Sequence, residues 1–196
     1  MNRLRQSRTA ATIAVVITGL AVVYTLALLA GLPDPGWAHL PRGIIHLGEL
    51  AAVVALALCG AAGGELLARI GLAAAGLGAL LLAVAEVGTE GSPALSNTLF
   101  TIAPVLVGLG LVLAGIAVIR TGLWSSWRRY VPLVLGAYVF VVMTPVIAAS
   151  GGPPAVASLW VLTGWEVLWV LIAVAVLTET APAVRDSTAP VVEGRT

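Results

Sequence analysis

Residues 9–32 read TAATIAVVITGLAVVYTLALLAGL, a 24-residue stretch without a charged side chain. An α-helix rises about 1.5 Å per residue, so about 20 apolar residues cross the roughly 30 Å hydrocarbon core of a bilayer. A helix also satisfies its backbone N–H and C=O groups internally, which hydrocarbon demands. The stretch is longer than the roughly 7 to 15 residues of a signal-peptide core. It therefore predicts an uncleaved membrane-spanning helix.

Similar apolar runs recur along the whole chain. Of the 196 residues, 60% are hydrophobic and 10% are charged, against about 25% charged in soluble domains. We predict an all-α integral membrane protein, a compact bundle of six transmembrane helices within a domain at 9–178. A basic cytoplasmic N-terminus at 1–8 precedes it, and a disordered cytoplasmic tail at 179–196 follows it. The predicted spans are 9–32, 43–60, 69–87, 98–119, 130–149 and 157–178.

The distribution of arginine predicts the orientation, since the chain contains no lysine. With a cytoplasmic N-terminus, nine of the ten arginines lie on the cytoplasmic side and only Arg42 lies outside, as the positive-inside rule requires. We therefore predict a multi-pass protein of the cell (plasma) membrane with both termini cytoplasmic. Richness in alanine, glycine, valine and arginine suggests a bacterial source. The net charge of +1 gives no reason to expect a nucleic-acid partner.

Two halves of the chain resemble each other. TIAVVITGLAVV from Thr12 matches TIAPVLVGLGLV from Thr101 at seven of twelve positions. A duplicated three-helix unit would place its copies in opposite orientations, the inverted-repeat plan of many transporters. Chains made mostly of alanine, valine, leucine, isoleucine and glycine also produce such matches by chance, and both interpretations stay open.

Small residues predict close contacts between helices. Gly60 and Gly64 form a GxxxG pattern at the end of the second predicted helix. Further small surfaces are expected on the third and fourth helices, at Gly71, Ala75, Gly76, Gly110 and Ala114.

Three polar side chains at the start of the second span stand out from their apolar surroundings. Arg42, His46 and Glu49 are spaced i, i+4, i+7, so they share one helix face. A carboxylate exposed to lipid costs about 2.5 to 3.5 kcal/mol on insertion scales. This face is therefore predicted to point toward protein or water.

Other polar features fall at a similar depth in the predicted outer half of the bilayer. Glu49 lies roughly 9 Å and Glu166 roughly 13 Å from the outer interface, at about 1.5 Å per residue. Pro104 and Pro145 interrupt their helices nearby and remove the amide partners of the Phe100 and Val141 carbonyls. The candidate residues of this polar layer are His46, Glu49, Glu166, Glu86, Thr144 and Trp165.

The polar layer has two interpretations. In one, it surrounds an outward-facing cavity that binds a proton, a cation or the polar head of a lipidic molecule, with Glu49 and Glu166 accepting protons. In the other, Arg42 and His46 neutralise Glu49 locally, while protonated Glu166 hydrogen-bonds a neighbouring helix. Trp165 and Trp169 either line such a cavity or fill space between helices.

No catalytic residue, metal site or cofactor is predicted. The single cysteine, Cys59, supplies no paired thiol ligand. His39, His46 and Glu49 match no zinc-ligand spacing, and two histidines near one helix end cannot ligate a haem across a bundle.

Three functional classes follow. The first is a small transporter or carrier with a proton- or cation-binding polar layer, whose ligand is a proton, a small molecule or a lipidic molecule. The second is an intramembrane acid/base enzyme acting on a lipid or isoprenoid, which two carboxyl groups permit in principle. The third is an accessory subunit with a membrane-protein partner. The enzyme is disfavoured because no nucleophile, metal cluster or phosphate-binding loop is apparent.

Overall fold

The computed structural model describes residues 2–178, and this part of the chain is helical without strands. Six helical spans are long and apolar enough to cross a membrane, which confirms the six apolar helices predicted from sequence. The predicted tail at 179–196 lies outside the described residues. The helices are α1 (Arg3–Leu29), α2 (His39–Cys59), α3 (Leu66–Gly88), α4 (Pro93–Thr121) and α7 (Val156–Leu177), with a composite fifth span of η1 (Ser126–Tyr130), α5 (Val131–Tyr138), η2 (Val139–Met143) and α6 (Thr144–Ser150).

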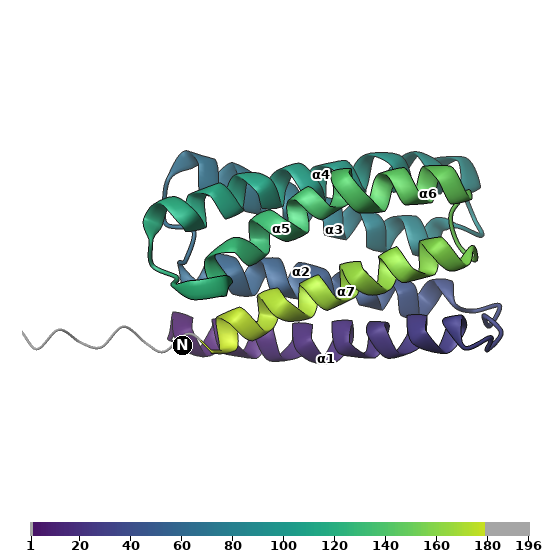
Figure 1. Ribbon diagram of the computed structural model, residues 1–196, viewed down its shortest axis with the longest axis horizontal. Coiled ribbons are helices and arrows are strands. Elements are labelled where there is room, and N and C mark those ends of the chain that lie inside the picture. The colour runs from purple at the N-terminus through teal and green to yellow at the C-terminus, as the bar shows by residue number, and fades with distance from the viewer. Residues whose placement is uncertain (1, 179–196) are drawn as a thin grey trace, which may run out of the picture.

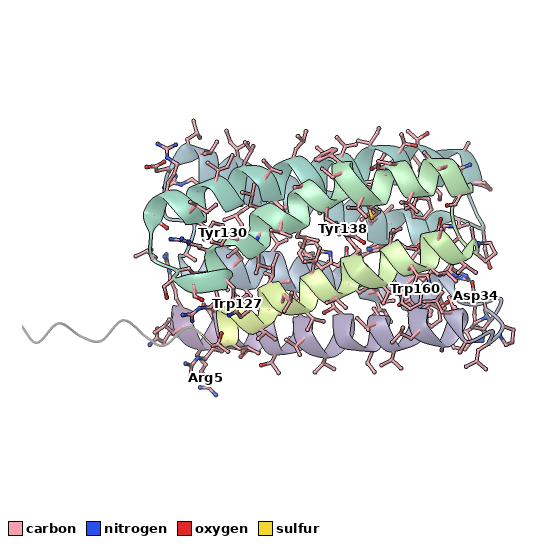
Figure 2. All side chains as sticks on the ribbon, viewed as in Figure 1. Arg5, Asp34, Trp127, Tyr130, Tyr138 and Trp160 are labelled. Carbon is pink, nitrogen blue, oxygen red and sulfur yellow. The ribbon has the colours of Figure 1, made fainter. Side chains whose placement is uncertain are left out.

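The six spans run back and forth along the long axis of the bundle (Figure 1). The connections α1–α2, α3–α4 and α6–α7 lie at one end, which also holds Asp34 and Trp160 (Figure 2). We call it the Asp34 end. The N-terminus and the connections α2–α3 and α4–η1 lie at the opposite end, with Arg5, Trp127 and Tyr130, which we call the Arg5 end.

Each span packs mainly on its neighbours in the chain, and α7 returns to pack on α1. Helix α7 also contacts α2 and α5, so it closes the bundle. The outward face of α1 exposes apolar side chains, among them Val16, Leu20 and Val23. Exposed leucine and valine along the middle of a helix are the surface that a lipid environment favours.

Two helices begin five or more residues earlier than the hydrophobic pattern indicates. Helix α1 begins at Arg3, six residues before the predicted start, with Asn2 as its N-cap accepting the Leu4 N–H at 3.3 Å. Helix α4 begins at Pro93, five residues before its predicted start, and proline is favoured in a first helical turn. Apolarity marks the part of a helix suited to hydrocarbon, whereas capping residues mark where the helix begins.

The GxxxG prediction at the end of the second helix is wrong. Helix α2 ends at Cys59, and Gly60 follows it with a left-handed φ of 78°. Gly64 lies in the turn before α3. Glycine adopts positive φ without a Cβ clash, so Gly60 ends the helix instead of forming part of a helix-packing motif.

The predicted small-residue contacts on α3 and α4 are confirmed where Gly71, Gly110 and Ala75 meet. A Cβ atom on Gly110 would lie 2.4 Å from the Ala75 backbone nitrogen, and one on Gly71 would lie 2.6 Å from the Gly110 carbonyl oxygen. A Cβ on Gly71 would also lie 2.7 Å from the nitrogen of Ala114. Gly76 differs, because it faces Leu50 at an ordinary contact distance of 3.5 Å.

Proline 145 coincides with a change in helix type. Residues Val139–Met143 are π-helical, and the Thr144 N–H bonds the Val139 carbonyl, five residues back. A proline lacks the N–H that continues an α-helix, and a π-type turn is one way to absorb the mismatch. The sequence predicted a break here, and the structure resolves it as a π-helical segment. Pro104, in contrast, lies inside a continuous α4.

Candidate functional site

A cavity of about 570 Å³ lies at the Asp34 end, between α1, α2, α3 and α7. Its volume falls within the range of small-molecule sites, about 300 to 1,000 Å³. Its wall combines apolar side chains with charged ones, and the fifth span contributes none of them. The lining residues are Tyr24, Thr25, Leu28, Leu32, Pro33, Asp34, Arg42, Ile45, His46, Glu86, Pro153, Pro154, Leu159, Leu162 and Glu166.

One part of the wall is a network centred on Asp34. The carboxylate of Asp34 accepts a hydrogen bond from the Tyr24 hydroxyl at one oxygen and from the Arg42 guanidinium at the other. Tyr24 comes from the end of α1 and Arg42 from the first turn of α2, so Asp34 joins the two helices across their connection. One of the two interpretations of the sequence had Arg42 neutralise Glu49, whereas in the structure Arg42 pairs with Asp34.

Glu49 lies deeper and has partners on both oxygens. Its side chain is 0% exposed. His46 Nδ1 lies 2.9 Å from Glu49 Oε2, and the Trp165 indole Nε1 donates to Glu49 Oε1 at 2.6 Å. An ionised carboxylate only accepts hydrogen bonds, so beside ionised Glu49 the proton of the first bond belongs to His46 Nδ1. Glu49 thus links α2 to α7 inside the bundle.

Trp165 and Trp169 form an edge-to-face pair one helical turn apart. Their ring centroids are 5.5 Å apart with an interplanar angle of 88°. Both are buried, and neither lines the cavity. The pair therefore fills space in the bundle, and Trp165 in addition holds the carboxyl of Glu49 in place.

Glu166 contrasts with Glu49. It is the residue after Trp165 on α7, it is only 6% exposed, and it lines the cavity. Its Oε2 atom is buried and has no hydrogen-bond partner within residues 2–178. Buried carboxyl oxygens in proteins are nearly always hydrogen-bonded, so an unpartnered one marks a place where a proton, water or ligand completes the bonding.

Glu86, from the last turns of α3, is half-buried and supplies a third carboxyl to the neighbourhood. Neither it nor Glu166 forms an ion pair within the described chain. Glu90 is separate from them, because it is exposed and pairs with His39 at 3.4 Å. His39 therefore does not join His46 and Glu49, and among residues 2–178 no three potential ligands converge as a metal site requires.

The polar layer is thus smaller than predicted. The structure brings together His46, Glu49, Glu86, Trp165 and Glu166 around or beside the cavity, through the contacts above. It leaves out Thr144, which is exposed on the fifth span and lies away from the lining residues. The error arose because depth along a helix was known from sequence, whereas the rotation of the helix was not.

Sequence reasoning missed Tyr24 and Asp34. A signal was available for Asp34, since it is the only aspartate before residue 186 and is eight residues from Arg42 across a short connection. Tyr24 carried no comparable signal, because a tyrosine near the end of an apolar span is typical of interfacial anchoring.

The chemistry of this arrangement comes from two unequal carboxyl groups. His46 and Trp165 contact the two oxygens of Glu49, whereas Glu166 lines the cavity and keeps one buried oxygen without a hydrogen-bond partner in the described chain. Such a group can accept a proton or a cation.

No protein-family model, curated protein or solved structure matches this chain.

Proposed function

We propose that the chain is a small membrane carrier that binds a proton or a cation at Glu166. The observation that carries the proposal is Glu166 itself, which lines a cavity of about 570 Å³ and whose buried Oε2 has no hydrogen-bond partner in the described chain. An ionised carboxylate held there without a partner costs several kcal/mol. A bound proton or cation removes that cost, so Glu166 is expected to be ionised only when a cation is bound to it.

Glu49 supports this role without sharing it. Its two oxygens are held by His46 and Trp165, so it forms a fixed part of the bundle next to the exchanging group. Two carboxyl groups in unlike environments are a recurring arrangement in sites where the two groups have different roles. No separate observation favours the acid/base enzyme or the accessory subunit.

The proposal includes a membrane orientation. The described arginines other than Arg42 lie in the parts of their elements nearest the Arg5 end, whereas Arg42 lies in the first turn of α2 at the Asp34 end; the positive-inside rule therefore assigns the Arg5 end to the cytoplasm. The start of α1 and the end of α7 lie there too (Figure 1), so the same assignment puts both on the cytoplasmic side, and we propose a bacterial plasma membrane as the setting. The cavity would then open in the outer half of the bilayer.

We further propose that the two halves are inverted repeats. The order in which the spans pack, each on its chain neighbour and the last on the first, is the order that such a duplication produces. Any closed ring of six helices has the same order, so superposition of an inverted first half on the second half is the direct test.

Proton binding can be tested by infrared spectroscopy of the purified protein between about pH 4 and about pH 10, a range that covers ordinary carboxyl and histidine titrations. We expect a carbonyl band from a protonated, weakly hydrogen-bonded carboxylic acid that disappears as pH rises and is absent in Glu166→Gln. Glu65→Gln is the matched control, because Glu65 is exposed before α3. Identical titrations in wild type and Glu166→Gln would refute the proposal.

Orientation can be tested by cysteine labelling in intact cells, in a Cys59→Ser background. An impermeant thiol reagent should modify Gly91→Cys, in the α3–α4 connection, and leave Ser125→Cys, beside η1, unmodified. Both positions are exposed in the structure. The reverse pattern would place the cavity on the cytoplasmic side.

A further inference from the structure

We propose that the ligand of the cavity is an organic ammonium: a primary or secondary amine with an apolar body, whose charged nitrogen binds Glu166. This inference rests on the proposed role of Glu166 as the exchanging group and adds the chemical class of what exchanges with the proton. Three properties of the wall support it: its charge, its apolar surface and its hydrogen-bonding needs.

The charge of the wall favours a cation. Among residues 2–178, Arg42 is the only arginine that lines the cavity, and its guanidinium is paired with Asp34. Glu86 and Glu166 line the same cavity, and no ion pair to either is found in residues 2–178. Glu86 lies within electrostatic reach of Arg42 and His46 but forms no direct ion pair with them, and Glu166 has no cationic partner in the described chain, so an anion would meet repulsion from these two carboxyl groups on binding.

The apolar part of the wall favours an organic ligand over a metal ion. Leu28 and Leu32 face the cavity from α1 and its following turn, Ile45 from α2, and Leu159 and Leu162 from α7. Burying apolar surface contributes about 25 cal/mol per Å², which only a ligand with a hydrocarbon body can use. A hard metal ion would need six or more oxygen ligands, and the described residues converge on no such set.

The hydrogen-bonding requirement narrows the class to amines that carry N–H groups. An ionised Glu166 accepts hydrogen bonds and donates none. The N–H of an ammonium supplies a charge-assisted hydrogen bond to the Glu166 carboxylate, roughly twice as strong as a neutral one. A quaternary ammonium offers charge alone, so it should bind less tightly than a primary amine of similar size.

Protons should compete with the amine, because both occupy the same carboxyl. The titratable and charged groups that line this cavity or bond beside it come from α1, the connection after it, α2 and α3. They are Tyr24, Asp34, Arg42, His46, Glu49 and Glu86. Asp34 and Arg42 are paired with each other, and Glu49 is bonded to His46. The loss of amine binding at low pH should therefore follow mainly the protonation of Glu166 and Glu86.

The test is isothermal titration calorimetry of the detergent-purified full chain with three probes of one shape: phenylbutylamine, phenylbutanol and phenylbutyrate. Titrations into empty micelles correct for partitioning. At neutral pH we expect the amine to bind about tenfold or more tightly than the alcohol, the factor that one charge-assisted hydrogen bond supplies, and the acid to bind least. Glu166→Gln should remove the preference for the amine, and Glu65→Gln should keep it.

Equal binding of amine and alcohol, or tighter binding of the acid, would overturn the inference using wild-type protein alone, so it does not depend on the variants folding. Infrared spectra of the same samples separate the two proposals. If the Glu166 acid band titrates but the amine neither binds preferentially nor removes the band, the ligand class is wrong and proton binding stands. If the band is absent, the proposed function itself fails.

Discussion

The contact between α3 and α4 and the space between α1, α2 and α7 are opposite solutions to packing helices. At the first, glycine and alanine let backbones touch, as at Gly110, where a Cβ would lie 2.4 Å from the Ala75 nitrogen. At the second, towards the Asp34 end, larger and charged side chains line a cavity of about 570 Å³. Small residues thus bring two backbones into contact at the first, whereas larger side chains surround space for a ligand at the second.

The largest expected effect is on the contact between α3 and α4. Gly110→Val should destabilise the protein by about 3 kcal/mol or more, because the new side chain meets backbone atoms of α3 that cannot rotate away. Gly19→Ala is the control: a Cβ there meets nothing within 4 Å, and the change should be neutral or slightly stabilising. Thermal unfolding in detergent measures both, and equal melting temperatures would show that the α3–α4 contact is not restrictive.

A second prediction contrasts the two carboxyl groups. Glu49→Gln should cost about 1.5 to 3 kcal/mol, because an amide cannot accept from both His46 and Trp165 and loses the charge that strengthens those bonds. Glu166→Gln should cost less than about 1 kcal/mol, because Oε2 makes no hydrogen bond that the change would break. Denaturant unfolding of both variants at neutral pH gives the difference, and equal losses would contradict the distinction between a fixed and an exchanging carboxyl.

A third prediction uses the tryptophan pair as its own control. Trp165→Phe and Trp169→Phe remove similar volume from buried positions, but only Trp165 donates to a carboxylate. The Trp169 Nε1 is buried without a partner within the described residues. We expect Trp165→Phe to be the more destabilising by about 1 to 2 kcal/mol, the cost of leaving one Glu49 oxygen unsatisfied. The midpoints and slopes of denaturant unfolding measure the difference between the two variants. Equal midpoints would show that the Trp165–Glu49 hydrogen bond contributes nothing.

The smallest expected effect on stability concerns the Asp34–Arg42 pair on the wall of the cavity. Asp34→Asn should change stability by no more than about 1 kcal/mol, since the Asp34–Arg42 pair is partly exposed. It should nevertheless weaken phenylbutylamine binding, because it frees the positive charge of Arg42 inside the cavity. Glu90→Gln, which removes the exposed partner of His39, is the matched control and should leave amine binding unchanged. Unfolding and calorimetry on the same samples test both parts.

Helix rotation separates the predictions that succeeded from those that did not. Arg42, His46 and Glu49 share one helix, so their common face followed from the spacing alone. Thr144 belongs to another helix, and its depth was similar while its direction was different. The π-helical turn before Pro145 alters the direction of residues around it, and no simple periodicity anticipates that change.

The order of apolar and polar residues by itself determined six long helices, the arginine-rich end and the grouping of three polar side chains on α2, because hydrophobicity, charge and helical periodicity are local properties of the chain. Tertiary structure alone decided which carboxyl is satisfied and which is not. Glu49 and Trp165 are 116 positions apart, and whether an oxygen finds a donor at that separation depends on how two helices turn toward each other. That turn follows from packing of the whole bundle, which leaves Glu166 as the unpartnered group facing the cavity.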